Sequence, residues 1–233
     1  MLSSAVSFIF NDMARRLRII FCLISVMFFI YAANGQTTRP EPQNLPKTIY
    51  RDSDGNIISN NEFVDIRMAN FHYPDATIRR LLPDGIIELR LQKIPQEGMR
   101  SPAVTFSLIS GEGISLSDLS GKVVVLHFWF IGCPACRAMR AQLSEFRKKF
   151  AGRDDIVFIA VTADSVPAVR NYLIKEPLNY LQAADASDVI GAFNIGGYPK
   201  NVVISKSGEI VYWRSTIKAW DKFEAAVRAE LAK

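Results

Sequence analysis

The chain has 233 residues, of which 49% are hydrophobic, and a formal net charge of +5. This length accommodates one full domain and an appendage, and the hydrophobic share is sufficient for a sizeable core. Because the positive charge is small and evenly spread, with no arginine-rich tract, the composition argues against a nucleic-acid-binding protein.

Residues 1–35 have the pattern of an export signal. Basic residues at 15–18 precede an apolar run at 19–33, and small residues follow at Ala33 and Gly35. This order is typical of a signal peptide, although the run is near the length of a short membrane-spanning helix. We therefore expect an exported protein of the periplasm or cell envelope, soluble after cleavage or anchored by residues 19–33. A buried helix of a cytoplasmic protein is the third alternative.

A short linker and a small segment follow the apolar run. Residues 36–46 are polar and contain prolines, as linkers do. Residues 47–101 are expected to form a small N-terminal α+β extension of unknown role. Its predicted elements are strands at 48–51, 57–58 and 86–91 and a helix at 60–69. Because about fifty residues provide little core of their own, we expect this extension to dock on the domain that follows.

From residue 102 to residue 233 strands and helices alternate regularly. Strands are predicted at 104–108, 123–130, 156–163, 180–183, 201–204 and 209–213, and helices at 134–150, 166–175, 187–193 and 219–233. Residues 123–130 are apolar at nearly every position, which indicates a strand buried on both faces. The order predicts an α/β fold with a mixed central sheet flanked by helices.

Cys133 and Cys136 stand at the junction of that buried strand with a helix. The third cysteine, Cys22, falls in the N-terminal apolar run. A disulfide scaffold needs more cysteines, and a zinc site needs four ligands, so we expect no metal. Because a helix N-terminus favours a thiolate, the pair is interpreted as a redox-active disulfide whose first sulfur is exposed. No other cofactor is expected.

Several motifs around the pair resemble the thioredoxin superfamily. Trp129 lies four residues before Cys133, Arg137 follows the second cysteine, and Tyr198-Pro199 enters a late strand. Together with the approach at 115–126, they are most similar to exported TlpA/ResA-type thiol–disulfide oxidoreductases. The resemblance covers residues 102–233 and implies a thioredoxin fold for them.

The resemblance also implies a role for each site residue. Cys133 would attack a partner disulfide and Cys136 would resolve the mixed disulfide. Pro199 would be a cis-proline facing the disulfide, Tyr198 would offer backbone groups to a substrate strand, and Trp129 would flank the pocket. The partners would be disulfide-bearing or dithiol proteins and a membrane electron-transfer protein.

Three positions depart from the family pattern. Met139 stands where glutamate is common, Ala141 where proline is common, and His127 where Asp or Asn is usual. With an ordinary pKa of about 6.5, His127 is able to accept the proton of the resolving sulfur. The alternative is a core histidine that only fills space.

Pro134 and Ala135, between the two sulfurs, suggest the direction of the reaction. They supply no imidazole or charge that would stabilise the thiolate and make the disulfide a strong oxidant. We therefore expect a reductase, as in cytochrome c maturation or general envelope disulfide reduction. Four alternatives stay open: a thiol oxidase or isomerase, a peroxiredoxin-like peroxidase, a redox-sensing binding module, and an inert structural disulfide.

Overall fold

The computed structural model describes residues 47–69 and 77–233. The predicted signal or anchor at 1–35, the linker at 36–46 and Cys22 therefore lie outside the described residues. Pro46–Lys233 form one compact unit. In the two ranges that are described, no helix combines the length and apolar character needed to span a bilayer.

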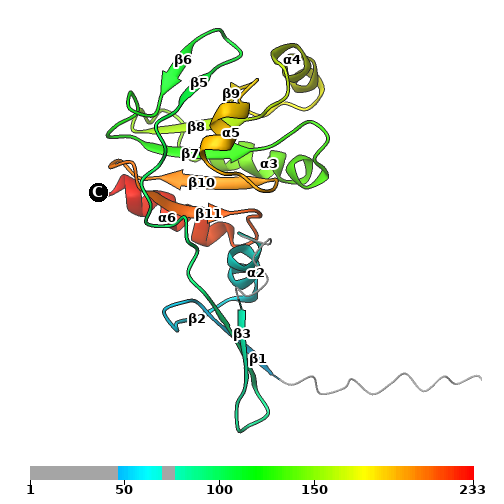
Figure 1. Cartoon of the computed structure of the whole chain (residues 1–233), viewed down its shortest axis with the longest axis vertical. Helices are drawn as coiled ribbons and strands as arrows, with labels where there is room; N and C mark the ends of the chain where they lie inside the picture. Colours follow the sequence, from blue (N-terminus) through cyan, green and yellow to red (C-terminus); the bar gives the residue numbers. More distant parts are fainter. Residues whose placement is uncertain (1–46, 70–76) are drawn as a thin grey trace, which may run out of the picture. The chain divides into compact units, whose positions relative to one another are not determined.

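A five-stranded mixed sheet forms the centre of the larger part of this unit (Figure 1). Its order is β11-β10-β7-β8-β9, with bounds Ile210–Arg214, Lys200–Ile204, Val123–Phe128, Ile156–Val161 and Leu181–Ala183. β7, β8 and β9 run parallel, whereas β10 is antiparallel to both of its neighbours. The predicted mixed sheet is confirmed.

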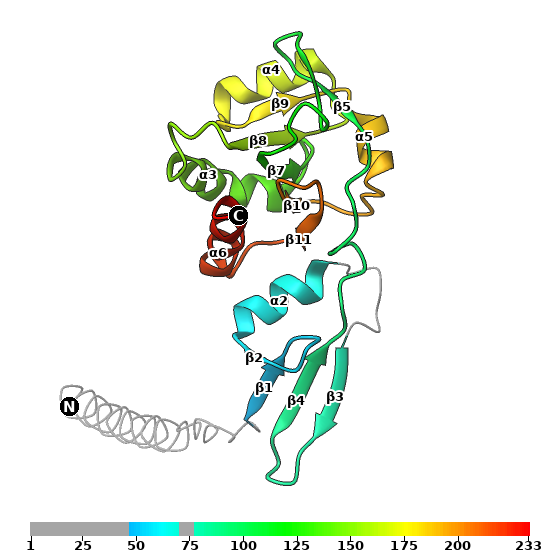
Figure 2. The same cartoon turned by 90° about the vertical axis from the view of Figure 1, so that its left-hand side faces the viewer.

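Helices cover both faces of this sheet, as Figure 2 shows. Their bounds are α3 Pro134–Lys148, α4 Val166–Lys175, α5 Ser187–Ala192 and α6 Trp220–Leu231. All six side chains of β7 are buried, and the five apolar ones are divided between two core clusters, because successive strand residues point to opposite faces. Val123 and Val125 pack with α3, α4 and α6, whereas Val124 and Leu126 pack with α5.

The N-terminal extension forms a second sheet with one helix. The order is β2-β1-β4-β3, with bounds Ile57–Ile58, Thr48–Arg51, Ile87–Leu91 and Thr77–Leu81, and α2 spans Asn60–Ala69. β3 is absent from the sequence prediction because its sequence, TIRRL, does not alternate: four of its five residues are exposed. A further hairpin of β5 (Thr105–Ser107) and β6 (Gly113–Ser115) precedes β7, and β6 was likewise not predicted.

Polar contacts of α2 hold the extension against the segment that connects β11 of the five-stranded sheet to α6. The carboxylate of Asp65, which is 2% exposed, accepts hydrogen bonds from Thr216 Oγ1 at 2.9 Å and from the backbone N–H groups of Lys218 and Ala219 at 2.6 and 2.7 Å. Ala219 is the N-cap residue of α6 and has no side-chain acceptor, so Asp65 supplies from another element an acceptor for its N–H and a negative charge at the start of α6. These contacts are the docking expected from the small size of the segment.

Candidate active site

The two cysteines are joined at the start of α3. The Cys133–Cys136 disulfide has an S–S distance of 2.04 Å and a Cα–Cα distance of 5.3 Å. Cys133 is the N-cap, Pro134 is the first helical residue, and the N–H of Cys136 donates to Cys133 Sγ at 3.0 Å. A thiolate formed at Cys133 would therefore face free N–H groups and the positive end of the helix dipole.

The exposure predicted for the first sulfur is wrong for the disulfide form. Cys133 and Cys136 are both only 4% exposed. They belong to the core cluster that contains Trp129 and Met139, and half-buried Tyr198 packs against it. Only the Pro134-Ala135 link of the motif is exposed. Met139, which replaces the family glutamate, is thus part of the apolar layer beside the disulfide.

The predicted cis-proline is present: the Tyr198–Pro199 peptide bond is cis. Lys200 pairs with Phe128, so continuing the antiparallel register by one residue places Pro199 beside Trp129. This register brings the proline loop to the end of β7, from which the chain leads into Cys133.

An open aromatic surface lies next to this loop. The rings of Phe130 and Tyr198 meet edge to face with centroids 5.4 Å apart, and Phe130 is 40% exposed. Burial raises the pKa of the Tyr198 hydroxyl, and the negative charge of Asp164 acts in the same direction. The neutral phenol and exposed Phe130 give this side of the site an aromatic surface.

Trp129 is part of the core wall under the disulfide and not an open side of a pocket. It is 4% exposed, and its ring lies 5.3 Å from that of Tyr172. Among the described residues, no group accepts a hydrogen bond from its indole N–H. Packing is therefore the role that its contacts show.

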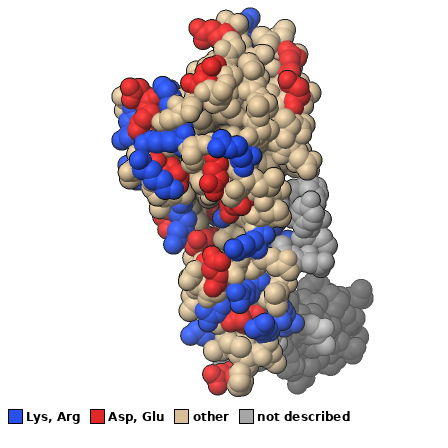
Figure 3. Space-filling model, turned by 60° about the vertical axis from the view of Figure 1, so that its left-hand side comes forward, with Lys and Arg blue, Asp and Glu red and all other residues tan. Residues whose placement is uncertain are grey.

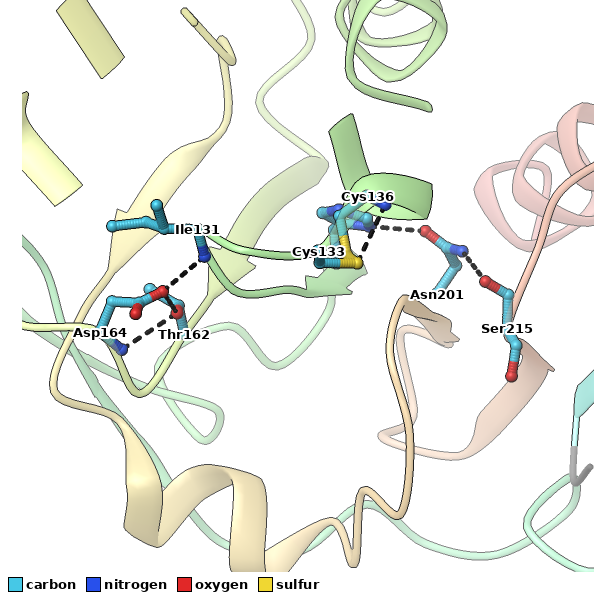
Figure 4. The surroundings of a disulfide bond; sticks show 8 residues. Ile131, Cys133, Cys136, Thr162, Asp164, Asn201 and Ser215 are labelled. Atoms are coloured by element: carbon cyan, nitrogen blue, oxygen red, sulfur yellow. Dashed lines mark hydrogen bonds between the residues drawn. A yellow bond between two sulfur atoms is a disulfide. The ribbon is translucent and has the colours of Figure 1, made fainter. Parts of the chain in front are cut away.

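Sequence reasoning missed the group that holds the loop before Cys133. The Oδ2 atom of Asp164 accepts a hydrogen bond from the backbone N–H of Ile131 and another from Thr162 Oγ1, both at 2.8 Å. Figure 4 shows this group on one side of the disulfide and Asn201 with Ser215 on the other. The available signal was a Thr-x-Asp sequence directly after the buried strand β8, at the edge where Cys133 also lies.

His127 lies in the sheet beneath the motif and is 2% exposed. Its Nδ1 is 2.9 Å from Asn201 Oδ1, across the β7–β10 pair. Strand alternation puts its side chain on the same face as Val125 and Trp129, which is the face of the cysteines. Burial lowers the pKa of His127 to about 4, although the hydrogen bond with Asn201 opposes this effect. The imidazole is therefore neutral at physiological pH and a weaker base than its ordinary pKa suggested.

This burial makes His127 an acid-sensitive group for stability. As the pH falls from about 6.5 to about 4, the unfolded chain binds a proton that the folded chain does not bind, so the folded state loses stability. The expected contribution is about 3 kcal/mol, from 1.36 kcal/mol per pKa unit. Urea unfolding at pH 7 and pH 4 should show a smaller acid loss in His127→Asn than in the wild type. An equal loss in both proteins would contradict the prediction.

The charged surface shows no single-sign stripe on the face drawn in Figure 3, where basic and acidic side chains are intermixed. Ion pairs are present among the described residues, such as Lys148 with Glu145 and Arg228 with Glu224. Intermixed charge of this kind agrees with the small net charge of the sequence and gives that face no phosphate-binding track.

Comparison with known proteins identifies the fold and the family. The Redoxin family model matches residues 96–224. The thiol-disulfide oxidoreductase ResA of Bacillus cereus is 30% identical over 118 residues, which are 50% of this chain and 68% of that protein. The soluble secreted antigen MPT53 of Mycobacterium tuberculosis is 29% identical over 126 residues, covering 53% and 71% of the two chains.

Among solved structures, a putative protein disulfide isomerase from Bacteroides thetaiotaomicron superposes with a TM-score of 0.55 at 24% identity. The match covers 60% of this chain and 92% of that chain. At this identity the likeness establishes the fold, which is the thioredoxin fold predicted for residues 102–233.

Proposed function

The chain belongs to the Redoxin family, as a TlpA/ResA-like oxidoreductase of the thioredoxin superfamily, and on that premise we propose that it reduces disulfides of partner proteins in the cell envelope through Cys133 and Cys136. One observation carries this proposal. A disulfide between cysteines that are separated by two residues lies at the N-terminus of α3, beside a cis Tyr198–Pro199 bond and the exposed ring of Phe130.

The proposed reaction moves two electrons from the dithiol to the partner. The Cys133 thiolate attacks one sulfur of the partner disulfide, and the other partner sulfur leaves as a thiolate that takes a proton from water. A mixed disulfide between Cys133 and the partner remains. Cys136 then loses its proton and attacks Cys133 Sγ, which closes the ring of the observed disulfide and releases the second partner thiol.

His127 is proposed as the group that receives the Cys136 proton. It is neutral and lies on the cysteine side of the sheet, and its Nδ1 is engaged by Asn201, which leaves Nε2 as the basic atom. With a pKa of about 4 it is a weak base, so it acts while Cys136 attacks and then passes the proton on. General bases of this kind contribute roughly a hundredfold or more to the rate.

Export is proposed from the N-terminal sequence. The basic residues at 15–18 and the apolar run at 19–33 form a signal or an anchor, and residues 36–46 link it to the folded part. The mycobacterial relative is named a secreted antigen, which supports this location. Outside the cytoplasm, a membrane electron-transfer partner would return the disulfide to the dithiol, and cytochrome c maturation is one such setting.

The reductase direction is tested by the reduction potential of the full chain. The Pro134-Ala135 link supplies no charge that would stabilise the reduced form, so the potential is expected below about −200 mV. The protein is equilibrated with glutathione buffers and the dithiol fraction is measured by alkylation and mass spectrometry. A potential near −120 mV, about that of strong periplasmic oxidants, would favour the thiol oxidase alternative.

A further inference from the structure

The residue after the cis-proline carries a buried positive charge. Lys200 is 3% exposed, and its ammonium donates to the backbone oxygen of Ala69 and, at 2.8 Å, to Ser215 Oγ. The ammonium also lies 5.3 Å from the centre of the Trp213 ring. Ala69 is the last residue of α2. Lys200 therefore connects the loop that contains Pro199 to the C-terminus of α2, where a cation is favoured.

Further hydrogen bonds connect Ser215 to the residues next to the disulfide. The backbone oxygen of Ser215 is 3.4 Å from Asn201 Nδ2, and Asn201 Oδ1 is 2.9 Å from His127 Nδ1. A connected set of groups therefore runs from Ala69 through Lys200, Ser215 and Asn201 to His127, and Figure 4 shows Asn201 between Ser215 and the disulfide. The five residues come from α2, β10, β7 and the position directly after β11.

The orientation of the Asn201 side chain follows from its surroundings. Its amide nitrogen faces two backbone oxygens, those of Arg214 at 3.5 Å and of Ser215 at 3.4 Å, and these atoms can only accept. The amide oxygen therefore faces His127. An oxygen acceptor requires that His127 Nδ1 carry the proton, which leaves the lone pair on Nε2.

We propose that Asn201 is a positioning residue that fixes the tautomer of His127, and that α2 of the N-terminal extension supports it through Lys200 and Ser215. The extension thereby gains a role in the redox site. The effect on the reaction rests on the proposed function of His127, whereas the effect on the tautomer does not.

The contact between Lys200 and α2 is strong because the ammonium of Lys200 is buried. An ammonium that is 3% exposed requires hydrogen-bond acceptors, because an unpaired charge in the interior is strongly unfavourable. Burial lowers the pKa of Lys200 to about 8, and the charge of Arg214 acts in the same direction, so the ammonium form still predominates at pH 7. If α2 shifted, Lys200 would lose its Ala69 acceptor, and Ser215, which it shares with Asn201, would move with it.

The test is the side-chain spectrum of His127 in the full chain. The sequence has only two histidines, His72 and His127, so long-range proton–nitrogen correlation spectra resolve them, and His127→Asn assigns the signals. The wild type should show a neutral ring with the proton on Nδ1. Asn201→Leu should give a mixture of both tautomers and slow the reduction of glutathione disulfide about tenfold, less than complete loss of a general base. Lys200→Met and Ser215→Ala should move the tautomer in the same direction.

Lys222→Met is the matched control. Lys222 of α6 pairs with Glu62 of α2 at 3.8 Å, but its side chain is 57% exposed and lies outside the path. The Lys222→Met substitution should leave the His127 spectrum unchanged. If Lys200→Met fails to fold, Ser215→Ala, which removes one hydroxyl, carries the test. A wild-type spectrum preserved in Asn201→Leu would overturn the positioning role, and one preserved in both Lys200→Met and Ser215→Ala would overturn the role of the extension.

The two proposals fail in different ways. A tautomer shift in Asn201→Leu combined with an unchanged reduction rate in His127→Asn supports the positioning role and refutes the proton transfer to His127. A slow His127→Asn combined with an unshifted Asn201→Leu spectrum refutes the positioning role and leaves the proton transfer in place.

Discussion

Cys136→Ser is expected to stop turnover and to leave the protein covalently joined to its partner. Cys133 can still attack a partner disulfide, but no second sulfur is present to release it. Loss of turnover should be about a thousandfold or more, as when one member of a nucleophilic unit is removed. Nonreducing gel electrophoresis of the full chain after incubation with a disulfide-containing protein should show a band that disappears on reduction.

The matched control is Cys133→Ser, which should lose turnover and trap nothing. Both variants are best made with Cys22→Ser, because the third cysteine of the chain could otherwise form its own adducts. Absence of a trapped species in Cys136→Ser would favour the redox-sensing binding module. Trapping through Cys136 in Cys133→Ser would reverse the assignment of the attacking and resolving sulfurs.

Asp65→Ala is expected to destabilise the protein by about 3 kcal/mol. The substitution removes the carboxylate at the start of α6 and leaves the N–H groups of Lys218 and Ala219 without their acceptor. A hydrogen bond to a charged group contributes about 1.5 kcal/mol or more, and two backbone bonds to the carboxylate are lost. Burial raises the pKa of Asp65, while the hydrogen bonds from Ala219, Lys218 and Thr216 oppose that shift, so the carboxylate depends on these donors.

Urea denaturation at pH 7 measures this loss. Asp65→Asn should fall between the wild type and Asp65→Ala, because the amide keeps one acceptor oxygen. Met68→Ala on the same helix is the control: Met68 is 38% exposed, and its loss should change the unfolding free energy by about 0.5 kcal/mol or less. A loss in Asp65→Ala no larger than that of Met68→Ala would show that the extension contributes little to the stability of the domain.

The elements with strong local signals were predicted closely. The apolar run at 123–130 became the fully buried strand β7, and the helices predicted at 60–69 and 166–175 have those bounds in the structure. The strands that were missed, β3 and β6, carry no alternation of apolar and polar residues. They form because a neighbouring strand offers hydrogen bonds, which is information from another part of the chain.

Local sequence patterns sufficed to recognise the redox chemistry, from two cysteines at a strand–helix junction and a Tyr-Pro pair before a late strand, and to predict an export signal at residues 1–35. Local spacing is enough for these features, because they depend on residues next to one another in the chain. Which distant groups pair with one another behind the cysteines is fixed instead by the packing of the folded chain. His127 and Asn201 are 74 residues apart, and Ala69 and Lys200 are 131 apart, so their pairing depends on the sheet order and on the docking of α2. Burial, which both conceals the sulfurs and lowers the pKa of His127, likewise arises only when distant elements pack together.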